Sequence, residues 1–235
     1  MIINHEVPIA CIRQATFNDY GYALAHNFEN KDYRRYFAEL SESQLVYLDN
    51  SAFELGESVP ADYLKKCAEA LSYRCMIFLP DVRNDSKETI KRSQEFIKHL
   101  PDCECWGVIQ GRDLDEQMEC LDKMLELTYN IAVPYGGPDR VAFMDNASGI
   151  LRRNNARVHL LGLRSMHELK QLRNNDIVFS IDTSLPVVTG IKGVELNMDT
   201  PKDPTMVWDL DVSALPATVY RNADFFRKIA LGDGD

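Results

Sequence analysis

The sequence predicts an α/β protein, a single (β/α)8 TIM-type barrel over residues 1–235. Short β-rich runs recur about every 20 to 30 residues, and stretches with helical spacing separate them. The later runs are almost wholly apolar, as strands that are covered on both faces tend to be. The length of 235 residues is close to the roughly 250 that are typical of such a barrel. No linker or repeat suggests a second domain.

Eight runs are predicted as strands. In chain order they are Val7–Ile12, Tyr22–Ala25, Leu45–Asp49, Cys75–Pro80, Cys105–Gln110, Ile131–Tyr135, Val158–Leu163 and Ile177–Asp182. The first two are joined too closely for a full helix. An open doubly wound sheet is the competing fold, but no glycine-rich nucleotide fingerprint follows the first run.

Helices are predicted between most of these strands. Two one-sided apolar stripes mark covering helices, one at Leu64, Cys67, Ala68 and Leu71 and one at Leu114, Met118, Leu121 and Leu125. Three helices begin with a capping residue followed by Glu at the third position after it, namely Asp85 with Glu88, Asp113 with Glu116, and Ser165 with Glu168. A last helix is expected around Ala223–Leu231, ended by Gly232.

Charge and cysteine content indicate the cellular setting. The net charge of −10 should repel nucleic acid and anionic membranes, so a polyanion partner would need a local basic patch. No apolar run approaches the roughly 18 residues that cross a bilayer, and the N-terminus does not read as an export signal. We therefore expect a cytoplasmic protein with no membrane partner and reduced thiols. The spacing of Cys103, Cys105 and Cys120 is not a common zinc pattern, so we expect no metal.

Polar residues close four of the predicted strands: Asp49, Asp81, Gln110 and Asp182. Because the active site of a barrel lies at the carboxyl ends of its strands, we expect these four to converge there. A lone Asp after a strand is more often a turn former or a helix cap. Four equivalent placements favour a site, in which two carboxylates could divide into a nucleophile and a general acid/base, as in glycosyl transfer.

Five segments, in order, resemble the tRNA-guanine transglycosylase family. LDNSAFELG resembles its Asp-Ser-Gly-Gly-Phe-Gln segment, LPDVRND its substrate-reading Asp, GVIQG its Gln-Gly pair, HLLGL its Leu-Met-Gly strand and SIDTSLP its Phe-Asp-Cys-Leu-Pro segment. The likeness covers about Leu45 to Pro186. It is greater to the compact DNA-acting relatives, often carried by phages, which exchange guanine in DNA for a 7-deazaguanine, especially around LDNSAFELG and ALAHNF.

Two departures from the family pattern matter. The zinc-binding Cys-x-Cys-x-x-Cys and His insert, which supports tRNA binding, has no counterpart, since the residues after Asp182 contain neither Cys nor His. This disfavours a tRNA enzyme and implies a barrel without the zinc-binding subdomain. The glycines of Asp-Ser-Gly-Gly are also replaced, because Asn50, Ser51 and Ala52 follow Asp49. The shape of that loop is therefore open.

The resemblance implies a role for each of the site residues. Asp182 would be the nucleophile that attacks C1′ of deoxyguanosine, and Asp49 the general acid/base. The purine would be bound by Asp81, Gln110, Gly111, main-chain groups near Val133, and Leu161 as an apolar platform. For Leu161 ordinary core packing is an equal alternative, and His26 reads better as a structural histidine. The substrates would be DNA and a 7-deazaguanine base, with no cofactor.

A basic stretch indicates where DNA could bind. Residues 152–173 contain six basic side chains and one acidic one, which is consistent with phosphate contacts from Arg152, Arg153, Arg157 and Arg164. A solvated helix face explains the pattern nearly as well. The alternative functions are a tRNA-guanine transglycosylase, a hydrolase and a non-catalytic nucleic-acid-binding barrel subunit. Homodimerisation and partner proteins are left open by the sequence.

Overall fold

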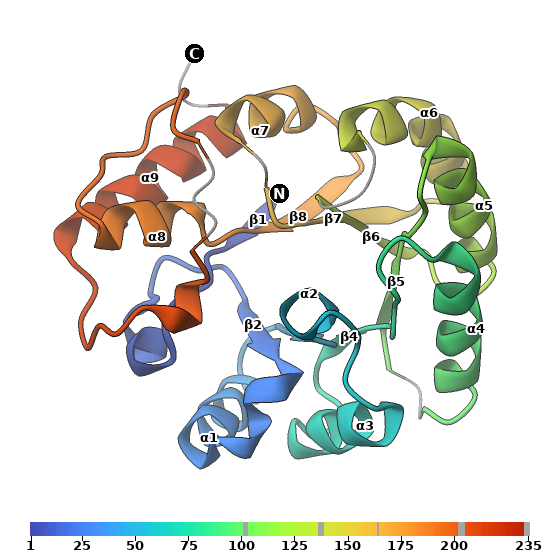
Figure 1. Ribbon diagram of the computed structural model, residues 1–235, viewed down its shortest axis with the longest axis horizontal. Helices are drawn as coiled ribbons and strands as arrows, with labels where there is room; N and C mark the ends of the chain where they lie inside the picture. The colour runs from blue at the N-terminus through green and yellow to red at the C-terminus, as the bar shows by residue number, and fades with distance from the viewer. Residues whose placement is uncertain (101–102, 136–138, 164, 202–204, 233–235) are drawn as a thin grey trace. The chain divides into compact units, whose positions relative to one another are not determined.

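The computed structural model describes residues 1–100, 103–135, 139–163, 165–201 and 205–232. Its strands form one eight-stranded sheet in the order β1-β8-β7-β6-β5-β4-β3-β2 (Figure 1). This order and the alternating helices confirm the α/β class and the (β/α)8 TIM-type arrangement. The chain comprises two compact units, Tyr20–His159 and Met1–Asp19 with Leu160–Asp235. A single domain over 1–235 stays a prediction.

The first of these units, Tyr20–His159, contains five consecutive parallel strands. They are β2 (Gly21–Leu24), β3 (Val46–Asp49), β4 (Met76–Phe78), β5 (Cys105–Val108) and β6 (Asn130–Pro134). The intervening helices are η2 (Ala25–Glu29), α1 (Lys31–Leu40), α2 (Ala52–Leu55), α3 (Ala61–Ala70), α4 (Ser86–Ile97), α5 (Leu114–Leu125) and α6 (Arg140–Arg153). Helix α5 lies between α4 and α6 (Figure 1). Strand β7 (Arg157–Leu161) begins at the end of this unit.

The second unit joins the two ends of the chain. Strand β1 (Ile2–Asn4) pairs in parallel with β8 (Val178–Asp182), with Asn4 opposite Asp182. The helices are η1 (Ile9–Gln14), α7 (Met166–Leu172), α8 (Leu185–Ile191), η3 (Val207–Asp209) and α9 (Ala217–Leu231). Helix α9 packs against α7 and α8, and Cys11, Val187, Val188 and Val219 belong to the buried core of this unit.

The first predicted strand is wrong. The chain forms β1 at Ile2–Asn4, and most of the predicted run Val7–Ile12 belongs to the 3-10 helix η1. Pro8 precedes that helix with φ −53 and carries no N–H for a strand ladder, so the run cannot continue as a paired strand. Each of the other seven predicted strands overlaps a strand of the sheet.

The three predicted helix starts are confirmed. The side chains of Asp85, Asp113 and Ser165 each accept a hydrogen bond from the backbone N–H of the Glu three residues later. The final helix also ends as predicted at Gly232, whose φ of 86 suits glycine, although the helix begins earlier, at Ala217.

Of the two apolar stripes, only the first is confirmed. Leu64, Cys67, Ala68 and Leu71 are buried. In α5 the predicted Leu121 is fully buried and Leu114, Met118 and Leu125 are half-buried, because the buried face, with Gln117, Cys120, Leu121 and Met124, is rotated from the predicted one. The reason is packing on β5: Gly107 leaves room for Met124, because a Cβ there would lie 3.2 Å from the Met124 Cβ.

Aromatic side chains fill the interior of the first unit. Tyr20, Tyr47, Phe78, Trp106 and His159 are buried with ring centroids 4.4 to 6.5 Å apart. Rings of this size bury a large apolar area and stabilise this unit.

Candidate functional site

A buried group of one carboxylate and two amides lies at the carboxyl ends of β3, β4 and β5. Asn50 Nδ2 donates to Asp81 Oδ1 at 2.8 Å, and Gln110 Nε2 donates to Asp81 Oδ2 at 2.6 Å. The exposed fractions of Asn50, Asp81 and Gln110 are 2%, 5% and 6%. Residues from three successive strand ends therefore meet at one point, as the sequence predicts for Asp81 and Gln110.

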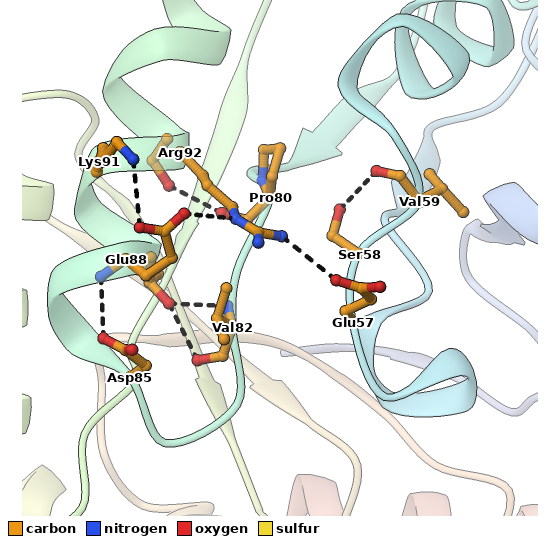
Figure 2. A network of polar contacts seen from close by, with 11 residues as sticks. Glu57, Ser58, Val59, Pro80, Val82, Asp85, Glu88, Lys91 and Arg92 are labelled. Carbon is orange, nitrogen blue, oxygen red and sulfur yellow. Dashed lines mark hydrogen bonds and ion pairs between the residues drawn. The ribbon is translucent and has the colours of Figure 1, made fainter.

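Helix α4 holds the loop that carries Asp81. The Thr89 hydroxyl accepts from the Val82 N–H at 2.8 Å and lies 3.2 Å from the Val82 carbonyl, and the Ser93 hydroxyl donates to the Pro80 carbonyl at 3.3 Å. Figure 2 shows Pro80 and Val82 beside α4. Since both hydroxyls are fully buried, the backbone on either side of Asp81 is held in place.

Asp49 is held at the end of β3 by two donors. The Tyr22 hydroxyl donates to Asp49 Oδ2 at 2.8 Å, and the Ser51 N–H donates to Asp49 Oδ1 at 2.6 Å. Both contacts orient a carboxylate with an exposed fraction of 9%. Asp49 directly precedes Asn50, which belongs to the Asp81 group.

The loop after Asp49 keeps a backbone shape that glycine would adopt easily. Ser51 has φ 62, in the left-handed region, and its hydroxyl accepts from the His26 N–H at 3.2 Å. Asn50 Oδ1 accepts from the Ala52 N–H at 2.8 Å, which closes the turn into α2. The replaced glycines therefore do not prevent a tight turn at this place.

Gln110 is fixed at its oxygen as well as at its nitrogen. Its Oε1 accepts from the Asn84 N–H at 3.0 Å, so the orientation of the amide is defined. The adjacent Gly111 is explained by packing: a Cβ there would lie 2.7 Å from the Gln117 N of α5. Gly111 thus allows the first turn of α5 to approach the end of β5.

Burial raises the pKa of Asp81, while the hydrogen bonds from Asn50 and Gln110 and the charge of Arg92 oppose that shift. Arg92 also joins two segments, because it pairs with Glu88 at 3.0 Å and with Glu57 at 3.9 Å (Figure 2). The Glu57 loop after α2 and the helix α4 are thus linked near the Asp81 group. A carboxylate so placed is well suited to bind a donor-rich ligand edge.

The other unit holds Asp182 at the end of β8. Its Oδ1 accepts from the Gly162 N–H at 3.1 Å, and its exposed fraction is 3%. Gly162 has φ 62, which turns the chain directly after β7. On the other side of β8, the Thr183 N–H donates to the Asn4 carbonyl at 3.1 Å.

His5 packs beside this strand end. Its Nδ1 lies 3.3 Å from the Thr183 carbonyl, and its ring contacts Phe17 and Phe226. Burial lowers the pKa of His5 from 6.5 to about 4, so the imidazole is neutral at pH 7. A neutral ring that bonds this carbonyl donates from Nδ1.

The remaining predicted binding residues lie on β6, β7 and η2. The Val133 carbonyl accepts from Arg140 Nη1 at 3.0 Å, and Leu161 ends β7. His26 lies in η2, where burial lowers its pKa. The structure thus groups Asp49, Asp81 and Gln110 in one unit. Convergence of Asp182 and Leu161 with them stays a prediction.

Three of the four predicted phosphate-binding arginines lie at the amino ends of the strands. Arg152 and Arg153 end α6, and Arg157 begins β7, whereas Asp49, Asp81 and Gln110 follow the carboxyl ends of their strands. Arg157 pairs with Glu104 at 2.9 Å. Arg164 lies outside the described residues. Arg83, in the loop after Asp81, and Lys87, in the first turn of α4, are exposed cations.

Sequence reasoning missed several residues of this site. Asn50 was noted only as a replaced family position, and Tyr22, Thr89, Ser93 and His5 were not singled out. Nothing local in the sequence marks them, because each acts on a residue between 7 and 178 positions away. Among the described residues no cluster of three His, Cys, Asp or Glu could hold a metal ion, and no helix there could cross a membrane.

Comparison with known proteins adds no further assignment. The sequence matches no protein-family model, and a search of curated proteins finds no match. The chemistry of the buried group is therefore the basis for a functional proposal.

Proposed function

We propose that this protein is a DNA-guanine transglycosylase, which exchanges guanine in DNA for a 7-deazaguanine through a covalent aspartyl-glycosyl intermediate. The observation that supports it most is the buried group in which Asn50 and Gln110 both donate to Asp81. Its composition suits the hydrogen-bonding edge of guanine, and its place at the strand ends suits a barrel active site.

The donor and acceptor pattern favours guanine over adenine. Each Asp81 oxygen accepts one amide hydrogen bond and keeps further acceptor capacity, which can meet the N1–H and the exocyclic amine of guanine. Gln110 Nε2 has a second hydrogen, suited to O6. Adenine presents an acceptor at N1 and a donor at C6, so it would leave these buried groups unmatched, and such mismatches are strongly rejected.

The proposed reaction consists of two displacements at C1′. Asp182 attacks C1′ of deoxyguanosine, the C1′–N9 bond breaks with its electron pair on the purine, and Asp49 supplies the proton. The incoming base then gives its N9 proton to Asp49 and attacks C1′, which releases the Asp182 carboxylate. Two inversions retain the β configuration, and the ester stores the glycosyl bond energy without ATP. Since C1′ of a stacked nucleotide is inaccessible, the target must be flipped or single-stranded.

The deciding experiment incubates the protein with radiolabelled guanine and either DNA or unmodified tRNA. We expect label in DNA only, and a covalent DNA adduct by mass spectrometry. Asp182→Asn should form no adduct, whereas Asp199→Asn, an exposed carboxylate in the same unit, should match the wild type.

Other outcomes identify the alternatives. Label in tRNA would indicate the tRNA enzyme, and guanine release without uptake would indicate a hydrolase. DNA binding with neither reaction would indicate a non-catalytic barrel subunit. An adduct with Asp182→Asn equal to that of the wild type would refute the assigned nucleophile.

A further inference from the structure

The side-chain amide of Asn50 is hydrogen-bonded at both its nitrogen and its oxygen inside the protein. Its Nδ2 donates to the Leu79 carbonyl at 2.7 Å and to Asp81 Oδ1 at 2.8 Å, and its Oδ1 accepts from the Ala52 N–H at 2.8 Å. The amide is thereby fixed in one orientation, with one N–H aimed at the carboxylate. It joins the end of β3 to the end of β4.

We propose that Asn50 is a positioning residue for base selection: it orients the Asp81 carboxylate so that the remaining lone pairs of its oxygens meet the two donors of a guanine edge. This inference rests on the proposed function and adds a residue to its recognition site. Asn50 itself does not need to touch the base for this role.

The surroundings of Asp81 explain why the amide matters. With the backbone on both sides held by Thr89 and Ser93, the remaining freedom of Asp81 is mainly rotation of its side chain. Asn50 restrains one carboxylate oxygen and Gln110 the other. A rotated carboxylate would misplace both acceptors for a planar base.

Protonation of Asp81 would convert one of its acceptors into a donor and oppose guanine binding. Burial favours the protonated form, and the Asn50 hydrogen bond opposes it. The other charged or titratable groups facing Asp81 are Arg92 of α4, which also favours the anion, and Cys120 of α5. Burial raises the pKa of Cys120 to about 11, so this thiol stays neutral at neutral pH.

The test follows the Asp81 carboxyl carbon by 13C NMR during a pH titration, with the signal assigned from Asp81→Asn. Asn50→Ala should raise the pKa of Asp81 by about one unit, a tenfold change in proton affinity, because a hydrogen bond to a charged group is lost. Asn50→Asp preserves the side-chain volume and should raise the pKa of Asp81 further, since two carboxyl groups then share one site.

Asn130→Ala is the matched control. Asn130 is equally buried in the same unit and donates to the Cys105 carbonyl, but it lies at the amino end of β6. We expect it to leave the Asp81 titration unchanged. An unshifted titration in folded Asn50→Ala and Asn50→Asp would overturn the inference, as would an equal shift in Asn130→Ala.

Guanine binding, measured by calorimetry over the same pH range, separates this inference from the proposed function. Guanine binding should weaken as pH falls. In Asn50→Ala the pH at which half of the binding is lost should rise together with the pKa of Asp81. A shifted titration in a protein that binds no guanine would support the positioning role and overturn the proposed function. Guanine binding with a midpoint unmoved by Asn50→Ala would overturn the inference alone.

Discussion

Gln110 donates to Asp81 across 2.6 Å, and the two residues follow the carboxyl ends of neighbouring strands β5 and β4. A carboxylate this deeply buried depends on such donors, because an unpaired buried charge is costly. The same contact orients Gln110, whose Oε1 is held by the Asn84 N–H. Burial, ionisation and orientation are therefore coupled in one small group.

The first prediction concerns Asp81. In Asp81→Asn one acceptor becomes a donor and faces the amide hydrogens of its neighbours. We expect guanine affinity to fall by about 100-fold or more, because a polar mismatch in a buried site leaves hydrogen-bonding groups unpaired. Calorimetry measures the affinity. Asp113→Asn, which alters an exposed helix cap, should lower the stability by at most about 1 kcal/mol and leave guanine binding intact; similar losses in both variants would argue against recognition by Asp81.

The second prediction compares two sets of cations in DNA binding. Arg83 is exposed in the loop after Asp81 and Lys87 in the first turn of α4, whereas Arg152 and Arg153 lie at the end of α6, before the amino end of β7. Because the proposed function brings DNA to Asp81, we expect Arg83→Ala with Lys87→Ala to reduce the slope of log Kd against log salt by about 2. Arg152→Ala with Arg153→Ala is the charge-matched comparison. A reduced slope in the Arg152 and Arg153 pair alone would support the phosphate-binding assignment made from the sequence and argue against Arg83 and Lys87.

The third prediction concerns the left-handed residue in the Asp49 loop. Ser51→Ala loses the hydroxyl contact to the His26 N–H and keeps the positive φ, so the free energy of unfolding should fall by about 1 kcal/mol. Ser51→Gly loses the same contact but relieves about 1 kcal/mol of backbone strain, so its stability should stay near that of the wild type. Urea denaturation measures both. Equal destabilisation in the two variants would speak against strain at Ser51.

The fourth prediction is an acid sensitivity due to His5. Its pKa is about 4 in the folded protein and about 6.5 when unfolded, so the unfolded state takes up the proton first as pH falls. The effect of His5 on the free energy of unfolding is therefore constant above about pH 7. By pH 4, proton binding to the unfolded state lowers that free energy by about 3 kcal/mol. Urea denaturation between pH 7 and pH 4 should show a smaller loss in His5→Gln than in the wild type. His99→Gln, at an exposed position, is the control and should lose as much as the wild type.

The sequence by itself determined the fold class, seven strands, three helix caps and the polar residues that close the strands. These features are local: apolar runs, capping pairs and turn residues specify them within a few positions. The apolar run at Val7–Ile12 looked equally local, yet Pro8 and the pairing of Ile2–Asn4 with β8 decided otherwise.

Only the tertiary structure decided which side chains meet. Asn50 and Asp81 are 31 positions apart, and strand register brings them within hydrogen-bonding distance. Likewise, the face that α5 buries follows from the room left by Gly107, and the edge on which Arg152 lies follows from the direction of α6. Hydrophobic periodicity carries neither piece of information, because register and helix rotation are set by packing between elements distant in sequence.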